Sequence, residues 1–269
     1  MVRAARRRLR PHEDRAVAVR IGTSGWTYGD WRGRFYPCKL PQRDWLAYYA
    51  ERFPTVELNV TTYRLPKESD LRRWAGAPPG FDYTVKLSRL ITHRKRPGDP
   101  RRFVENFFAR IAPLAPRIGN VLAQFPPTFA RDDDALEAFF ETLPAGYRFV
   151  VEFRHRSWYT EDIYARLRAR GFSLCLHDLR GSVAPLVLTG PVLYIRLHGP
   201  VRAYAGSYRR VRLERWAHTI RDLAPQVAAT YVYFNNDQRA FAPRNAATLR
   251  ALLDETDGDQ TAANSLAGR

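Results

Sequence analysis

Eight short segments rich in β-branched and aromatic residues recur along the chain, and amphipathic segments separate most of them. The predicted strands are 18–23, 55–60, 82–88, 120–125, 148–153, 173–177, 192–197 and 230–235. The predicted helices are 43–53, 67–75, 100–114, 133–143, 161–170, 213–223 and 244–253. Strands that alternate with helices pair in parallel through right-handed crossovers. Eight such repeats within 269 residues predict an α/β protein with a single-domain (β/α)8 TIM-type barrel.

One repeat departs from this pattern, because the segment after the sixth strand is too short for a full helix. Residues 179–191 contain Gly and Pro, so we expect a loop or a short turn there. An open doubly wound sheet is the alternative architecture, and it usually has a glycine-rich phosphate loop after its first strand. Residues 22–26, Gly-Thr-Ser-Gly-Trp, lack that pattern, which favours the closed barrel.

The two ends of the chain differ from the region between them. Residues 1–16 are Arg-rich without the apolar stretch of a secretory signal, and residues 255–269 are small and polar. We expect a disordered basic arm, a barrel over residues 17–254 and a disordered tail. No apolar run reaches the roughly 18 residues of a membrane span, so no membrane partner is expected. Two cysteines cannot form a disulfide framework, and we predict a cytoplasmic protein.

The formal net charge of +17 favours an anionic partner. Only four of the 44 basic residues are lysines, and the arginines are scattered over the predicted helices as on a solvated surface. Charge alone therefore leaves nucleic acid as an alternative to a small anionic molecule.

Most of the predicted strands become polar towards their C-terminal ends, often as pairs of residues on one face. The same-face pairs are Glu57 and Asn59, Lys86 and Ser88, Glu152 and Arg154, Arg196 and His198, and Asn235 and Asp237. Gln124 ends the fourth strand, and His177 and Asp178 end the sixth. Residues i and i+2 of a strand share a face, and helices cover the outside of a barrel. We therefore expect most of these side chains in the lumen at the end where such barrels hold their active sites.

These residues have chemically distinct candidate roles. Glu57, Lys86, Glu152 and His198 are the candidate catalytic groups. Trp26, Asn59, Gln124, Arg154, His177, Asp178, Arg196, Tyr208, Asn235 and Asp237 are the candidate substrate-binding residues. The alternative is a structural layer of ion pairs that plugs the barrel, although an apolar plug is usually as stable.

Lys86 is the most informative of the candidates, because lysine is rare in this chain. An ammonium can lose its proton or form a Schiff base, which a guanidinium cannot do. Its presence at a strand end therefore indicates chemistry, with a chance occurrence of one of four lysines as the alternative.

A series of ordered motifs resembles a known family. The segments are 22–26 with Trp31 and 35–37, 57–59 with Tyr63, 85–86 with 92–93, 124–127, 151–154 with 157–158, 196–199 and 234–237. The chain resembles the YecE-like family, also called domain of unknown function 72, from the first strand to the last. The resemblance implies a TIM-type barrel and brings no established reaction. Thr62 stands where an aromatic residue is expected.

Three classes of function are compatible with these observations. The leading hypothesis is an enzyme, a hydrolase, isomerase or lyase, that acts on a small anionic, cyclic substrate resembling a sugar or nucleotide. The second is a nucleic-acid-binding or metal-dependent nucleic-acid-processing barrel. The third is a non-catalytic ligand-binding protein. No cofactor and no metal ligands are predicted, a divalent metal is the weaker alternative, and the oligomeric state is undetermined.

Overall fold

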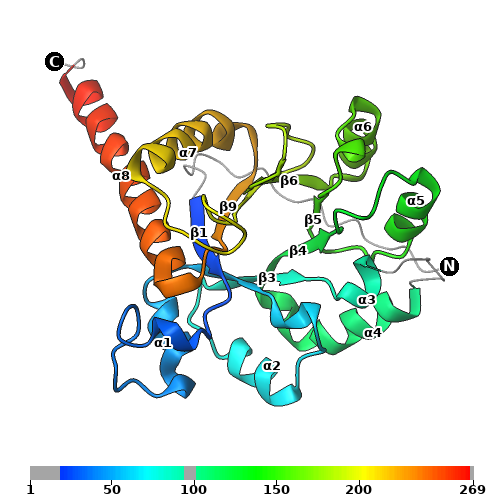
Figure 1. Ribbon diagram of the computed structural model, residues 1–269, viewed down its shortest axis with the longest axis horizontal. Coiled ribbons are helices and arrows are strands. Elements are labelled where there is room, and N and C mark those ends of the chain that lie inside the picture. Colours follow the sequence, from blue (N-terminus) through cyan, green and yellow to red (C-terminus); the bar gives the residue numbers. More distant parts are fainter. Residues whose placement is uncertain (1–18, 94–100, 267–269) are drawn as a thin grey trace.

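Eight parallel strands close into a barrel at the centre of the protein (Figure 1). They are β1 (Val19–Ser24), β2 (Thr55–Leu58), β3 (Asp82–Lys86), β4 (Ile118–Gln124), β5 (Phe149–Glu152), β6 (Ser173–Leu179), β8 (Val192–Leu197) and β9 (Ala229–Phe234). The computed structural model describes residues 19–93 and 101–266. Each strand pairs in parallel with both neighbours, and pairing of β1 with β9 and of β5 with β6 closes the sheet. The predicted (β/α)8 fold is confirmed, with strand ends within two residues of the predicted ones.

Helices surround the barrel (Figure 1). They are α1 (Trp45–Ala50), α2 (Glu68–Ala75), α3 (Arg89–Thr92), α4 (Arg101–Ile111), α5 (Asp133–Glu141), α6 (Glu161–Arg170), α7 (Arg210–Leu223) and α8 (Phe241–Leu266). The predicted strand 55–60 ends early, because Asn59 adopts helical backbone angles before a 3-10 turn at Val60–Thr62. Helix α7 begins at Arg210, before the predicted residue 213. The sequence did not reveal this start, because the N-cap is Arg209 and arginine is not a typical capping residue.

The sixth repeat has no helix, as predicted. The chain turns at Gly181, whose φ of +83° favours glycine, and forms the short strand β7 (Ser182–Val183). This strand pairs antiparallel with the end of β6. The helices on either side of this repeat are α6 and α7, so the ring of helices in Figure 1 lacks one member there.

The structure describes one of the two chain ends for which we expect disorder. The arm at residues 1–16 lies outside the described residues. Helix α8 extends to Leu266, through much of the segment expected to be a disordered tail. No proline interrupts residues 244–266, and extending a helix that is already formed costs far less than starting one. None of the helices in the described parts of the chain has the length and apolar character of a membrane span.

Most of the apolar core lies between the strands and the helices, and the barrel interior is packed separately. The interior cluster consists of Leu122, Val150, Cys175, Val192, Tyr194, Tyr231 and Tyr233. These side chains fill the middle of the barrel. The polar residues at the C-terminal ends of the strands therefore lie on top of this packed layer of side chains and do not line a pore.

Candidate functional site

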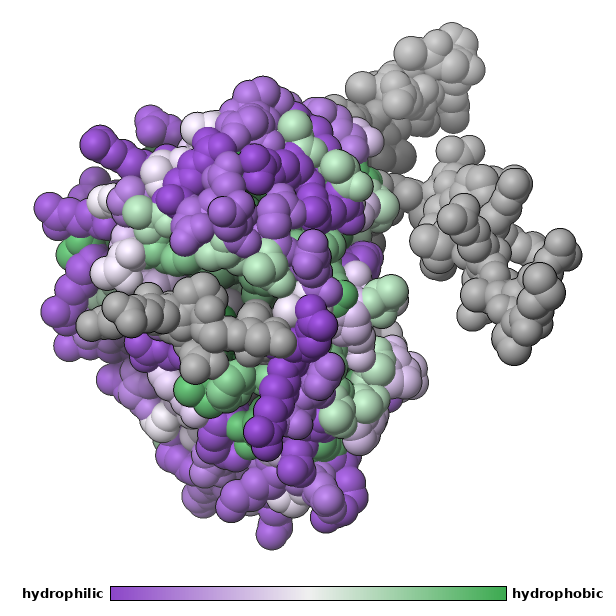
Figure 2. Space-filling model, turned by 90° about the vertical axis from the view of Figure 1, so that its right-hand side faces the viewer, coloured by the Kyte–Doolittle hydropathy of each residue, from purple (hydrophilic) through white to green (hydrophobic). Residues whose placement is uncertain are grey.

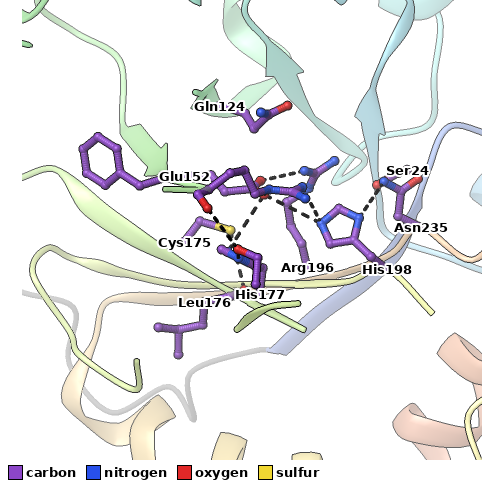
Figure 3. Close-up of polar contacts among 12 residues, drawn as sticks. Ser24, Gln124, Glu152, Cys175, Leu176, His177, Arg196, His198 and Asn235 are labelled. Carbon is purple, nitrogen blue, oxygen red and sulfur yellow. Dashed lines mark hydrogen bonds and ion pairs between the residues drawn. The ribbon is translucent and has the colours of Figure 1, made fainter. Parts of the chain in front are cut away.

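A buried ion-pair network occupies the C-terminal end of the barrel (Figure 3). Its centre is Arg196, which is 1% exposed. Arg196 Nη1 lies 2.6 Å from Glu152 Oε2, and Nη2 lies 2.6 Å from Glu57 Oε1. Both carboxylates are completely buried. One guanidinium therefore bridges carboxylates from β2 and β5, which are three strands apart around the barrel.

Two neutral groups complete the surroundings of Glu57. The Ser24 hydroxyl donates to Oε1 at 2.8 Å, and the Tyr194 hydroxyl donates to Oε2 at 2.7 Å. Both oxygens of this carboxylate are thus hydrogen-bonded, as a buried charge requires. Sequence reasoning did not include Ser24 and Tyr194 among the site residues, although Tyr194 lies on the same strand face as Arg196.

The network continues from Glu152 to His198. Arg154 Nε pairs with Glu152 Oε1, and Arg154 Nη2 lies 2.9 Å from His198 Nε2. The other ring nitrogen of His198 lies 3.0 Å from the Asn235 side-chain amide. Burial, followed by the nearby Arg196, holds the pKa of His198 well below its usual value. The imidazole is therefore neutral at physiological pH, and its Nε2 can accept a hydrogen bond from Arg154 and so hold that guanidinium in place.

The arginines also determine the protonation of Glu152. Burial acts to raise the pKa of this carboxyl, but Arg154 and Arg196 outweigh it and hold the pKa well below 4.5. A carboxylate fixed in its ionised form is a poor general acid. The geometry thus favours a role for Glu152 in holding guanidinium groups over the acid/base role expected from the sequence.

Lys86, the last residue of β3, differs from the other charged groups of the site. Its backbone carbonyl accepts a hydrogen bond from the Thr61 hydroxyl at 2.6 Å, but its ammonium makes no hydrogen bond or ion pair with any residue in the described parts of the chain. Burial, followed by repulsion from Arg196, lowers its pKa to about 8, although Glu57 and Glu152 oppose this change. Lys86 is therefore an ammonium near a balanced network, with a proton that it can release close to neutral pH.

A second histidine connects the network to a surface cavity. His177 Nε2 lies 3.1 Å from the Ser182 hydroxyl on β7. Its Nδ1 is buried 3.9 Å from Glu152 Oε1 and has no hydrogen-bond partner among the described residues. Ser182 also lines a cavity of about 380 Å³. The other residues around this cavity are Pro127, Arg154, His155, Arg156, Tyr159, Gly181 and Val183. The cavity is therefore rich in positive charge and adjoins the buried network.

Not all predicted site residues converge on the lumen. Asp178 lies on the outer side of β6, where Arg212 of α7 approaches both carboxylate oxygens at 2.7 Å. Tyr208 is buried and accepts a hydrogen bond from the Gly199 backbone at 3.0 Å. These two residues attach the loop before α7 to the barrel. Asp178 fails to converge because it is adjacent to His177 and so points to the opposite face of the strand.

Other predicted binding residues lie near the rim. Trp26 is buried and packs edge-to-face against Trp74, which is a core contact. Asn59 and Gln124 are half-buried at their strand ends. Asp237 is half-buried after β9, and burial raises its pKa to about 6. The structure therefore brings Glu57, Glu152, Arg154, His177, Arg196, His198 and Asn235 into one network, with Lys86 close to its charges.

The aromatic ring of Tyr204 lies beside this network. Its centroid is 5.9 Å from that of His198, and its backbone N–H donates to the His198 carbonyl at 2.7 Å. Tyr204 has a φ of 66° and is 50% exposed. A tyrosine held in the left-handed region beside a buried polar site is typical of functional strain. Tyr204 is not among the candidate site residues predicted from the sequence, because a local pattern does not reveal its backbone conformation.

No group of His, Cys, Asp and Glu side chains suited to a metal ion occurs among residues 19–93 and 101–255, whose side chains the structure describes. The physical reason is visible in the network, where guanidinium groups already occupy the carboxylates of Glu57 and Glu152. A divalent cation at these oxygens would have to displace Arg196.

Known proteins share this architecture. A family profile described as "Protein of unknown function DUF72" matches residues 20–267. The UPF0759 protein YunF of Bacillus subtilis is 27% identical over 271 positions, covering 88% of this chain and 95% of that protein. The UPF0759 protein YecE of Escherichia coli K12 is 34% identical over 182 positions, covering 67% of this chain and 62% of that protein.

Solved structures agree with these matches. The crystal structure of a DUF72 family protein, TM1631 of Thermotoga maritima, is 33% identical and aligns with a TM-score of 0.81 over 88% of this chain and 99% of that one. A DUF72 family protein of Enterococcus faecalis, EF0366, has a TM-score of 0.76 at 19% identity over 88% of this chain and 96% of that one, which shows the shared fold. Because the family profile spans nearly the whole chain and covers both the barrel and its buried network, this protein belongs to the DUF72 family.

Proposed function

We propose that the protein is an enzyme that acts on a small anionic, ring-containing substrate by proton transfer at the C-terminal end of the barrel. The observation that carries this proposal is the Lys86 ammonium, which has no ion-pair partner in the part of the chain that the structure describes. Glu57 and Glu152 are already matched by the guanidinium groups of Arg196 and Arg154. Lys86 therefore leaves a positive charge that a substrate phosphate or carboxylate would neutralise.

The pKa of Lys86 suits both binding and proton transfer. A value of about 8 leaves the group mostly protonated at neutral pH, yet close enough to neutrality to exchange its proton. Arg154 supplies a second cation at the edge of the cavity, and Glu152 and His198 hold it in place. In this scheme Lys86 Nζ exchanges a proton with the substrate. Glu57 and Glu152 hold Arg196 and Arg154 in position through their ion pairs.

The aromatic and basic rim favours a substrate with a ring. Tyr204 presents an exposed ring beside His198, and aromatic faces bind sugar and base rings. Arg156 adds positive charge to the cavity beside Arg154. These features support a sugar- or nucleotide-like anion. The free thiols Cys38 and Cys175 are compatible with the proposed cytoplasmic location.

The proposal is tested by titrating the protein with inorganic phosphate, glucose 6-phosphate, adenosine monophosphate and neutral glucose, with calorimetry as the readout. We expect the phosphorylated rings to bind and glucose to fail. Lys86→Met should weaken binding at least about tenfold, as loss of a charge-assisted contact does, whereas the exposed-lysine control Lys39→Met should not. Affinity should also fall as the pH rises through about 8, where Lys86 loses its proton. Equal affinity of the Lys86→Met and Lys39→Met proteins would contradict the proposal.

The other two hypotheses make different predictions in the same assay. A nucleic-acid-binding barrel should bind oligonucleotides with a steep salt dependence, and it should prefer them to mononucleotides. A metal-dependent variant should lose ligand binding in the presence of a chelator. A non-catalytic binding protein should retain Lys86-dependent affinity but leave every bound compound chemically unchanged.

A further inference from the structure

A second cavity lies on the outside of the barrel, beside the repeat that lacks a helix. Its volume is about 680 Å³, within the range of roughly 300–1,000 Å³ that is typical of small-molecule sites. One wall is the connection from β6 to β8, and the other is α7 with the loop before it. We call this cavity the α7 groove. Its lining residues are Asp178, Val183, Ala184, Leu186, Pro200, Val201, Ser207, Arg209, Val211, Arg212, Arg215, Trp216 and Thr219.

The α7 groove concentrates the exposed apolar surface of the molecule. The described residues include eight large apolar side chains that are exposed, and four of them line this groove. These four are Val183, Leu186, Val201 and Val211. Other parts of the surface are different, since the side over α5 and α6 in Figure 2 is mostly hydrophilic. An apolar patch gathered in one concave place is typical of a binding site.

Positive charge lies on the α7 side of the groove. Arg209, Arg212 and Arg215 recur at intervals of three residues, which places them along one side of the helix. Arg212 is paired with Asp178, but Arg209 and Arg215 make no ion pair within the described parts of the chain. The first turn of α7 contains no acidic residue that could offset them. The groove therefore combines an apolar wall with two uncompensated cations.

We infer that the α7 groove binds an amphipathic anion with a single unbranched hydrocarbon chain and a carboxylate head, that is, a fatty-acid-like molecule. The chain would lie along Leu186, Val201 and Val211, and the head would pair with Arg209 or Arg215. Charge complementarity selects an anion, and the apolar lining selects a hydrocarbon tail. The hollow shape and modest volume favour one detached molecule over a membrane surface. This site differs from the proposed active site, because Asp178 and the groove lie outside the strands and Lys86 does not line it, although Val183 borders both cavities.

The experiment titrates the full chain with dodecanoate and follows heat and tryptophan fluorescence. Dodecanol lacks the charged head and acetate lacks the chain, so each should bind at least about tenfold more weakly than dodecanoate. Trp216 lines the groove, so Trp216→Phe should remove most of the fluorescence change while dodecanoate still binds.

Matched variants locate the binding site. Leu186 and Leu90 are 58% and 61% exposed, and only Leu186 lines the groove. Leu186→Asp should therefore weaken dodecanoate binding at least about tenfold, and Leu90→Asp should leave it within about twofold. The double change Arg209→Gln with Arg215→Gln should have the effect of Leu186→Asp, whereas Arg43→Gln at an exposed site elsewhere should not. Lys86→Met should leave dodecanoate binding unchanged, since it alters only the proposed active site.

Several outcomes would overturn the inference. One is an absence of dodecanoate binding at about 1 mM, an affinity weaker than roughly −4 kcal/mol. A second is equal binding by the Leu186→Asp and Leu90→Asp proteins. A third is Leu186-dependent binding to phosphatidylglycerol vesicles without binding of free dodecanoate, which would assign the groove to a membrane. A fourth is a dimer in sedimentation that Leu186→Asp dissociates, which would assign it to a second copy of the chain.

Discussion

The two ends of the barrel both contain ion pairs, but the pairs lie in different surroundings. At the N-terminal end, Arg20 Nε lies 3.0 Å from Asp82 Oδ2, and these side chains are 25% and 19% exposed. The Tyr231 hydroxyl donates to the same oxygen at 2.7 Å. At the C-terminal end, Arg196 is 1% exposed and both of its carboxylate partners are fully buried.

This difference in exposure changes what each ion pair does for the protein. The Arg20–Asp82 pair keeps partial contact with water, so its charges lose less solvation free energy than fully buried ones, and it closes the N-terminal end of the barrel at a smaller cost. A buried network costs several kcal/mol per charge unless each charge is matched, and an apolar plug would usually be as stable. The unmatched Lys86 adds to that cost. The comparison teaches that the N-terminal end closes the barrel at low cost, whereas the C-terminal end holds a costly buried network, which the proposed function would explain.

Replacing the central arginine should have the largest effect on this comparison. Arg196→Met leaves two buried carboxylates without their shared partner, and we expect a loss of roughly 3–5 kcal/mol in the free energy of unfolding. Arg20→Met at the N-terminal end should cost less, about 1–2 kcal/mol, because Asp82 is partly exposed and keeps its hydrogen bond from Tyr231. Urea denaturation at neutral pH measures both. Similar losses for the two variants would show that the two ends do not differ in the way described.

The pH dependence of stability sharpens the same comparison. The pKa of Glu152 is held well below 4.5 in the folded protein. A carboxyl with a depressed pKa contributes stability above its unfolded pKa, and that contribution is lost as the pH falls through the folded value. Wild-type protein should therefore lose stability on acidification. In Arg196→Met this loss should be smaller, because Glu152 has lost one of its two cations; an unchanged acid dependence would contradict this.

Lys86→Met should have a smaller effect of opposite sign. A fall in the pKa from 10.5 to about 8 corresponds to as much as roughly 3 kcal/mol of destabilisation at pH 7. Removing the ammonium should therefore raise the free energy of unfolding. Between pH 8 and 10.5 the unfolded chain binds the proton and the folded chain does not, so wild-type stability should rise in that window. Denaturant melts across this range, with Lys39→Met as the control, test the sign. A destabilised Lys86→Met protein would favour the structural-plug hypothesis.

Tyr204→Asn should have the smallest effect on stability. Asparagine tolerates the left-handed backbone region better than tyrosine, so relief of strain should offset the lost ring contact to within about 1 kcal/mol. Under the proposed function, the same change should weaken binding of glucose 6-phosphate and leave binding of inorganic phosphate unaltered. Calorimetry with the two ligands measures this ratio. A parallel loss of both affinities would indicate that Tyr204 supports the network and does not contact a ring.

Two patterns in the sequence determined the fold and most of the site: the alternation of strands with helices, and the period of two along each strand. Eight β-rich runs predicted the barrel, and the short segment after the sixth run predicted the missing helix. The spacing of Glu57, Glu152, Arg154, Arg196 and His198 placed them on one face, because side chains of a strand alternate with a period of two. Local pattern was sufficient here, since each of these features depends only on neighbours along the chain.

Only the tertiary structure decided which charges pair and which remain alone. The alternation of side chains could not show that Arg196 bridges Glu57 and Glu152, because those contacts join strands far apart in sequence. Nor could it show that the Lys86 ammonium has no ion-pair partner among the described residues. Nor could it place Asp178 outside the barrel or give Tyr204 its backbone angle. Pairing, burial and the resulting pKa changes depend on distances across the barrel, and those distances are set by how the eight strands close.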